Sequence, residues 1–427
     1  MKSGALPRSR PHAVISGVGV VSPIGIGRHD FWSALKNGTA GVRPVSIFDT
    51  AGLPCHDACE IADFSPETLL GKKGLKYLDR STQLAACATA LAFEDAGFAP
   101  ASNGRSGVGL VLGTMFGSVE SVSAFDCQIL QEGPRSVNPM GFPRTVINSP
   151  AGHVAIRFGL TGLNTTISAG TVSSLQAIAY AADFIADERA DVLLAGGVEE
   201  LGAMSYSGFC AAQLLAGSDG TGSRPAAPLD VDRSGFSVGE GAVVFVVESL
   251  EHASRRGATV LAEISGFGTT HLAPSPDTDR QSAAAAQAMR AALADACVDR
   301  ASVGAVCAGA NGGRIGDQVE ARAIAAVFGT AAATLPVYSI KSMVGETLGA
   351  AGAFQVAASL LTLREQVAPA TVNFREADPL WGLAGITRQA VTTMAEVTIA
   401  NSFGPDGINA SLVLRRPAGP WTESPGS

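Results

Sequence analysis

The residues of this sequence that are best placed to do chemistry lie at a turn between an expected strand and an expected helix. The stretch 164–178 has the composition of a strand that turns sharply into a helix. Thr171 stands at the turn, and Ser168, Ser173 and Ser174 flank it. A threonine hydroxyl has a pKa far above that of a thiol and needs an adjacent base to attack a thioester. For the three serines we expect hydrogen bonding at the helix start.

A second candidate group is the pair Lys341 and Glu346 in the later half of the chain. Glu346 could in principle be the base for Thr171. If the intervening loop bends back, however, Lys341 pairs with Glu346, because a buried unpaired carboxylate is costly or takes up a proton. We therefore favour a structural role, in which Glu346 is a polar plug neutralised by Lys341 or by water.

Residues 272–427 contain no histidine. A neutral histidine ring is a side chain that could donate a hydrogen bond to an enolate. The six histidines all lie earlier in the chain: His12, His29, His56, His153, His252 and His271. Cys55 and Cys59 flank His56, but no second ligand pair follows at zinc-site spacing, so we predict no metal site. No cofactor is predicted either.

The turn and six further blocks, in the same order, resemble the β-ketoacyl synthases, the condensing enzymes of fatty acid and polyketide assembly. The resemblance runs from about residue 12 to residue 416. The six blocks are residues 14–25 with 31–32, 78–81 with 92–97, 190–197, 230–236 with 239–242, 341–345 with 348–352, and 401–404.

The resemblance implies three catalytic positions, and each holds a substitute here. A family member has a cysteine at the turn, and registration on Ala177-Ile178 places Thr171 there. The first family histidine corresponds to Gly309, by registration on Asp317 and Glu320. The second corresponds to Glu346, because the family's Lys-x-x-x-Gly-His block reads Lys341 to Glu346.

Two motif positions of the family are retained, at Lys341 and at Phe403 of the Asn-Ser-Phe-Gly block. The residues after that block depart from the family's Phe-Gly-Gly and read Pro405-Asp406-Gly407. In the family this loop moves to admit substrate; proline would stiffen it and aspartate would add charge. Ordinary condensation by this chain alone is therefore not expected.

The family resemblance implies an α/β fold of the thiolase-like layered αβαβα type, built from two similar halves. We expect a flexible N-terminus at 1–11, halves at 12–259 and 260–416, and a disordered Pro/Gly/Ser-rich tail at 417–427. Residues 108–113 and 242–247 read as buried strands and 258–264 as the strand that opens the second half. Helices are expected over 176–190, 281–295 and, fully buried, 348–363.

Composition excludes several classes of function. A net charge of -8 argues against nucleic-acid binding, which needs a dense cationic face. The sequence has no apolar run of the roughly 18 residues that a membrane helix requires. The cysteines form no regular framework, which fits a reduced, cytoplasmic protein.

Together these features resemble a chain-length factor, a degenerate ketosynthase that pairs with an active ketosynthase in type II polyketide systems. The implied partners are that ketosynthase, in a heterodimer, and acyl carrier protein. Met115, Phe116 and Phe142 are candidates for the tunnel or interface wall, although core packing explains each equally well. The pathway could be fatty-acid-like, for example polyene-forming. Two alternatives stay open: an acyltransferase or thioester hydrolase that uses Thr171 and Glu346, and a scaffold that binds acyl carrier protein.

Overall fold

Within residues 13–98, 107–218 and 224–417, which the computed structural model describes, the main strands form two half-sheets joined edge to edge. The expected flexible segment 1–11 and, apart from Pro417, the expected tail lie outside the described residues. The first half-sheet has the order β6-β5-β7-β8-β1, and the second has the order β11-β10-β14-β15-β9. The two orders correspond strand for strand.

The strands of the first half-sheet are β1 (Ala13–Ser22), β5 (Gly109–Gly113), β6 (Asn164–Ile167), β7 (Val192–Glu199) and β8 (Gly241–Ser249). Those of the second are β9 (Ala262–His271), β10 (Ala305–Cys307), β11 (Val337–Tyr338), β14 (Val397–Phe403) and β15 (Ile408–Arg415). The junction is short: β1 pairs with β9 only from Ala13 to Ile15.

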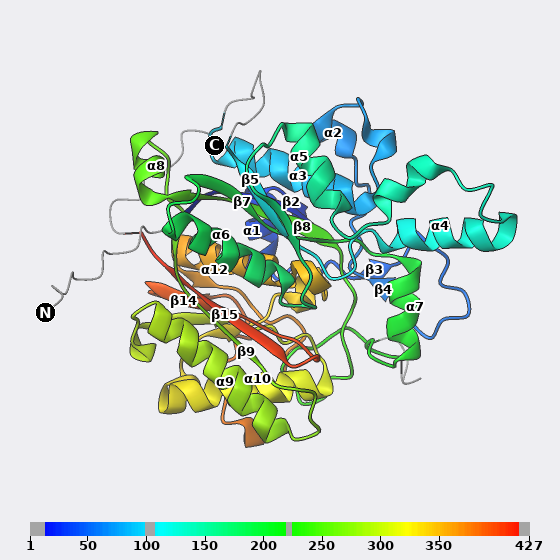
Figure 1. Ribbon diagram of the computed structural model, residues 1–427. Coiled ribbons are helices and arrows are strands. Elements are labelled where there is room, and N and C mark those ends of the chain that lie inside the picture. Colours follow the sequence, from blue (N-terminus) through cyan, green and yellow to red (C-terminus); the bar gives the residue numbers. More distant parts are fainter. Residues whose placement is uncertain (1–12, 99–106, 219–223, 418–427) are drawn as a thin grey trace, which may run out of the picture.

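Helices cover both outer faces and fill the space between the half-sheets, so the chain has five layers (Figure 1). The central layer is α6 (Ser173–Ala186) and α12 (Ala351–Glu365). The outer layers are α3 (Arg80–Asp95) with α5 (Ser149–Phe158), and α9 (Thr278–Asp295) with α10 (Arg314–Phe328). This is the layered αβαβα arrangement of two similar halves that the sequence predicts.

Shorter helices and strands connect the elements of these five layers. The helices are α1 (Arg28–Lys36), α2 (Pro66–Leu70), α4 (Val119–Glu132), α7 (Ala203–Ala211), α8 (Leu250–Arg255) and α11 (Lys341–Val344). The short strands are β2 (Gly25–Ile26), β3 (Arg43–Pro44), β4 (Asp57–Ala58), β12 (Val367–Ala368) and β13 (Val391–Thr392). The described residues also form six 3-10 turns: η1 (Leu75–Tyr77), η2 (Pro139–Arg144), η3 (Arg300–Ser302), η4 (Gly329–Ala333), η5 (Leu348–Ala350) and η6 (Pro379–Trp381).

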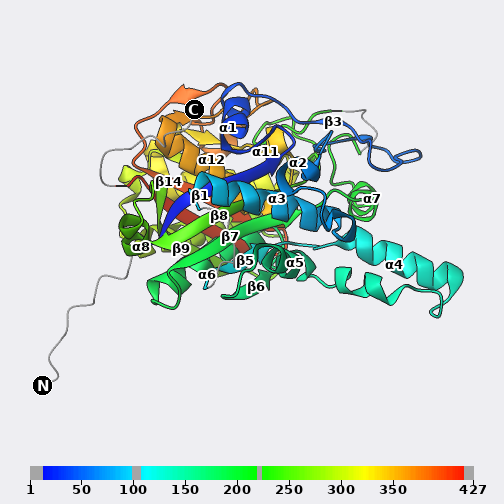
Figure 2. The same cartoon turned by 90° about the horizontal axis from the view of Figure 1, so that it is seen from above.

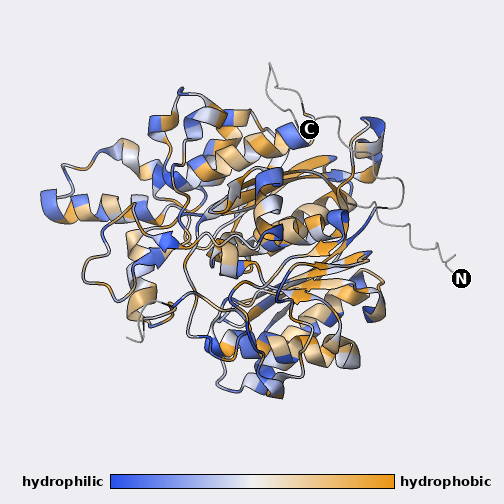
Figure 3. Cartoon of the chain, turned by 180° about the vertical axis from the view of Figure 1, so that it is seen from behind, coloured by the Kyte–Doolittle hydropathy of each residue, from blue (hydrophilic) through white to orange (hydrophobic). Residues whose placement is uncertain are grey.

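The hydrophobic core follows the layers. The largest cluster lies between the half-sheets, where α12 is buried at every residue from Ala351 to Leu363. Two other clusters lie under the outer helices, one beneath α3 and one beneath α9 and α10. The central strands are accordingly apolar while the outer helices carry polar residues on their exposed faces (Figure 3). An apolar strand pair covered on both faces is typical of α/β folds.

The predicted elements are present, with shifted ends. The helix predicted to start at Leu348 begins with the 3-10 turn η5 and becomes α-helical at Ala351. The strand predicted from Ala258 begins at Ala262, because ladder pairing with β1 starts only where Ala262 meets Ile15.

Candidate functional site

The turn between β6 and α6 has the sharp geometry that the sequence predicts. Gly170 has a φ of 61°, and a bridge joins Ala169 to Thr171 around it. The Ser173 hydroxyl braces the turn, since it donates to Gly170 O at 2.6 Å and accepts from Ala169 N at 2.9 Å. None of the three serines caps α6, so that expectation was wrong: the Ser174 hydroxyl accepts from Ala353 N of α12 at 2.9 Å, and the Ser168 hydroxyl donates to Met115 O at 3.3 Å.

Thr171 lies at the turn with a hydroxyl that nothing activates. Its Oγ1 is buried and has no hydrogen-bond partner among the described residues. The backbone of Thr171 is held from the other side, where Ser402 Oγ donates to Thr171 O at 2.9 Å. Attack by a hydroxyl requires a base in hydrogen-bonding contact, and that contact is not made here.

Glu346 is held in a buried ion pair with Lys341. The two side chains are 2% and 4% exposed, and Lys341 Nζ lies 2.7 Å from Glu346 Oε2. The chain bends back between them because α11 ends at Gly345, which has a φ of 78°. Leu348 N also donates to Glu346 Oε1 at 3.0 Å. The pairing that the sequence suggested is therefore present, and Glu346 does not contact the Thr171 hydroxyl.

Gly309 follows β10 in a loop whose backbone is packed closely against β14. A Cβ at Gly309 would lie 2.8 Å from Asn401 O, so the neighbouring backbone leaves little room for a side chain. The sequence analysis missed Asn311 in the same loop. Its Nδ2 donates to Glu346 Oε2 at 2.7 Å and so links Glu346 to the loop that holds Gly309.

Two buried carboxylates hold this loop in place. Glu320 Oε1 accepts from Gly309 N at 2.9 Å and from Asn401 Nδ2 at 3.2 Å. Asp317 accepts from the backbone N–H groups of Asn311 and Gly312. Burial raises the pKa of Glu320 to about 7 and that of Asp317 to about 6, against the lowering effect of these hydrogen bonds. These acids position backbone rather than a substrate.

Phe403 ends β14 and is half-buried against the core beneath α9 and α10. The four residues after it form the turn of the β14–β15 hairpin, in which Phe403 pairs with Asn409. Asp406 projects from this turn toward Gly170: a Cβ at Gly170 would lie 2.7 Å from Asp406 Oδ2. The departure from the family motif therefore contacts the nucleophile turn directly.

The candidate wall residues lie beyond the end of β5. Met115 and Phe116 are half-buried, and their backbone N–H groups donate to the buried carboxylate of Glu199 at 2.7 and 2.9 Å. Burial raises the pKa of Glu199 to about 7. Phe142 is 57% exposed, and its ring contacts that of Phe125 on α4 at 6.2 Å between centroids.

An arm formed by α4 and η2 projects from the body of the molecule (Figure 2). None of the side chains in α4 or η2 is buried. Exposed apolar residues lie on this arm and on the neighbouring helices α5 and α6: Leu130 at 83%, Met140 at 78%, Ile156 at 79% and Tyr180 at 42%. Strand β6 lies beside them as the edge strand of its half-sheet. An exposed apolar patch beside an edge strand is typical of a protein interface.

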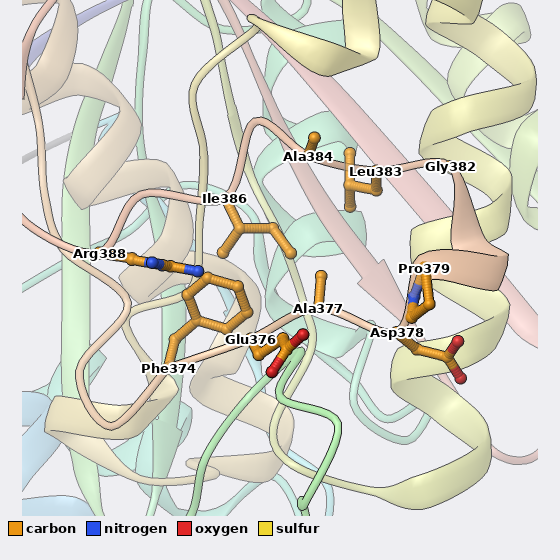
Figure 4. A pocket seen from close by; sticks show the side chains of 10 residues that line it. All are labelled: Phe374, Glu376, Ala377, Asp378, Pro379, Gly382, Leu383, Ala384, Ile386 and Arg388. Carbon is orange, nitrogen blue, oxygen red and sulfur yellow. The ribbon is translucent and has the colours of Figure 1, made fainter.

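Two surface hollows lie away from these positions. One of about 450 Å³ is lined by residues of the 374–388 loop, where the Arg388 guanidinium lies 5.8 Å from the Phe374 ring centroid (Figure 4). The other, of about 220 Å³, includes Arg80 and Glu200 in its lining. Neither includes a candidate catalytic residue. In the described part of the chain, no group of three or more His, Cys, Asp or Glu side chains could hold a metal ion.

Comparison with protein families matches the chain over both halves. A family model described as "Beta-ketoacyl synthase, N-terminal domain" matches residues 12–253, and one described as "Beta-ketoacyl synthase, C-terminal domain" matches residues 261–375. No helix in the described residues is long and apolar enough to cross a membrane.

Individual relatives resemble the chain over almost its full length. It is 36% identical over 409 residues to a 3-oxoacyl-(acyl-carrier-protein) synthase 2 of Coxiella burnetii, which covers 94% of this chain and 98% of that protein. It is 33% identical over 416 residues to the protein of the same name from Vibrio cholerae, with 96% and 100% covered.

Solved structures agree with the sequence relatives. The ishigamide ketosynthase/chain length factor superposes with a TM-score of 0.88 at 30% identity, over 95% of this chain and 99% of that one. A β-ketoacyl synthase from Burkholderia phymatum has a TM-score of 0.86 at 32% identity, over 95% and 99%.

Proposed function

Because this chain belongs to the β-ketoacyl synthase family, we propose that it is a catalytically inactive subunit of the chain-length-factor type. In this role it pairs with an active ketosynthase and shapes the tunnel that receives the growing acyl or polyketide chain. The partner supplies the chemistry, and acyl carrier protein delivers substrate to the complex. We place this complex in the cytoplasm.

One argument carries the proposal: the residues that register on the family's three catalytic positions cannot do the family's chemistry. Thr171 Oγ1 has no partner that could act as a base. Gly309 has no side chain. The Glu346 carboxylate is paired with Lys341 and, as a hydrogen-bond acceptor, has no donor to offer an enolate. Condensation needs a nucleophile and donors for the enolate, and neither is provided.

The surface supports pairing with a second thiolase-fold subunit. Strand β6 presents an unpaired edge in the described part of the chain, with Ile156 and Tyr180 exposed beside it. Exposed apolar side chains and an open strand edge are costly on an isolated protein and are covered when subunits associate. Phe142 on the projecting arm is then placed to contribute to the partner's tunnel.

Co-expression tests the proposal. The tagged chain, produced with a ketosynthase of the same organism that has its cysteine and both histidines, is expected to purify as a one-to-one complex that makes product. Ile156→Glu should abolish copurification, because it places a charge in the proposed interface. Ile315→Glu is the matched control: this residue is 59% exposed on α10, on the opposite outer layer, and its substitution should leave the complex intact.

Product length gives a second measurement. Phe142→Ala should shift the chain-length distribution of the product without weakening copurification. If the tagged chain purifies without the ketosynthase and binds carrier protein alone, it is a scaffold and the proposal fails. If it becomes stably acylated alone, and Thr171→Ala removes the acyl group, it is an acyltransferase and the proposal also fails.

A further inference from the structure

The turn that joins β14 to β15 is fixed at each of its four residues. Gly404 N donates to Ile408 O at 2.8 Å, and Gly407 N donates to Gly404 O at 3.0 Å. Pro405 restricts its own φ angle. Gly407 has a φ of 86°, and any Cβ there would overlap Leu272 O.

The remaining residue of this turn, Asp406, is held by its own side chain. Its Oδ1 accepts from Ile408 N at 3.3 Å, which is the local bond that stabilises aspartate in turns. The other oxygen, Oδ2, is the nearest atom to the position that a Gly170 Cβ would take, at 2.7 Å. A turn with little conformational freedom therefore holds a carboxylate against the loop before α6.

The contact closes the surroundings of Thr171. Ser402, one residue before the end of β14, donates to Thr171 O at 2.9 Å, so the same hairpin holds the turn at two points. Thr171 Oγ1 is buried although Asp406 itself is exposed. A reacting carbonyl must come within about 3 to 3.5 Å of a nucleophile, whereas Thr171 Oγ1 is buried in a turn that this hairpin contacts at Gly170 and at Thr171 O. The carboxylate would also oppose the oxyanion that forms on attack.

We propose that Asp406 and its hairpin turn act as a fixed lid over residue 171, which keeps this subunit from being loaded with an acyl group. The lid rests on the proposed function, since it directs loading to the partner's cysteine. Acylation of this subunit is then prevented in two ways, by the missing nucleophile and by the lid. A thiol restored at residue 171 would still be shielded.

A reporter thiol in the full-length protein tests the lid. Thr171→Cys places a cysteine in the tryptic peptide of residues 158–189, which has no other cysteine, so its labelling by iodoacetamide can be followed by mass spectrometry. Native Cys127, which is exposed on α4, is the internal reference for labelling, and the buried Cys87 and Cys307, which should stay unlabelled, report folding. The reporter is combined with Asp406→Gly, which removes the lid, and with Asp406→Asn, which removes only the charge.

We expect the reporter thiol alone to react far more slowly than Cys127. Asp406→Gly should speed its labelling at least about tenfold, because access opens and a carboxylate no longer disfavours the thiolate. Asp406→Asn should give an intermediate rate. The lid is refuted if the reporter reacts as fast as Cys127, or if Asp406→Gly leaves its rate unchanged while Cys127 reacts normally. Either result leaves the copurification test of the proposed function untouched.

Discussion

Replacing Lys341 with methionine tests whether the Lys341–Glu346 pair is structural. Both side chains are almost fully buried, and their charged atoms are 2.7 Å apart. Lys341→Met keeps most of the apolar volume and removes the positive charge. It leaves the Glu346 carboxylate buried with Asn311 Nδ2 and Leu348 N as its remaining donors among the described residues.

The expected loss of stability is set by the burial of the pair. Removing one partner of a buried ion pair costs about 3–5 kcal/mol, because the remaining charge loses its counterion in a low-dielectric site. Replacing both partners with apolar groups of similar volume is about neutral. The double variant Lys341→Met/Glu346→Met should therefore recover much of the stability that the single variant loses. The two hydrogen bonds to Glu346 are lost in the double variant, so recovery is incomplete.

Urea unfolding of the wild type, both single variants and the double variant measures this as a double-mutant cycle. The single variant is expected to unfold at a clearly lower urea concentration, with an unchanged slope. The structural interpretation of Glu346 is refuted if Lys341→Met costs less than about 1 kcal/mol, the value of an exposed pair. It is also refuted if the double variant is no more stable than the single variant.

Two other predictions concern buried polar groups. Glu320→Gln keeps both hydrogen bonds of Glu320, which are accepted by one oxygen. Burial raises the pKa of Glu320 from 4.5 to about 7, so the folded wild type is more protonated than the unfolded chain between these values. Its stability should fall by about 2–3 kcal/mol from this group between pH 5 and pH 8, and the glutamine variant should escape that loss. The prediction is contradicted if the melting temperatures of the wild type and of the glutamine variant change equally with pH across this range. Thr171→Val removes a buried hydroxyl without a partner among the described residues, so the free energy of unfolding should be unchanged or rise by about 1 kcal/mol. The complex that contains this variant should make the same product. Loss of product would show that the hydroxyl is used.

Much of the fold could be predicted because its strands are continuous apolar runs. Residues 108–113 and 242–247 have no polar face, which only a strand covered on both sides tolerates, and they form β5 and β8. The ends of elements were less certain. Residues 258–261 are as well suited to a strand as residues 262–264, and pairing with β1 decides where β9 begins. The layered architecture of two halves came from resemblance to a family, and the strand order was not predicted, because apolar runs do not encode their neighbours.

The candidate site was predictable where it depended on residue type and only partly where it depended on contacts. Thr171, Gly309 and Glu346 were assigned to the family's catalytic positions by registration, which stays a prediction, whereas the ion pair that was expected from the cost of burying a carboxylate is present. Asn311 was missed, because an amide among glycines reads as an ordinary turn residue. Its partner Glu346 is 35 positions away. The approach of Asp406 to Gly170 likewise depends on how the β14–β15 hairpin lies over α6, which no local pattern records.

The substitutions at the catalytic positions are integrated into the surrounding structure, so restoring the family residues should not restore condensation. Glu346→His would remove the carboxylate that accepts from Lys341 Nζ and Asn311 Nδ2. Gly309→His would place a Cβ 2.8 Å from Asn401 O, in a loop that Glu320 and Asp317 hold in place. Thr171→Cys would place its thiol behind the Asp406 turn. The triple variant, assayed without a partner with malonyl and acyl carrier proteins, is therefore expected to give no elongated ketone. Efficient elongation would show that the loss of chemistry is confined to three side chains and that the packing around them was never an obstacle.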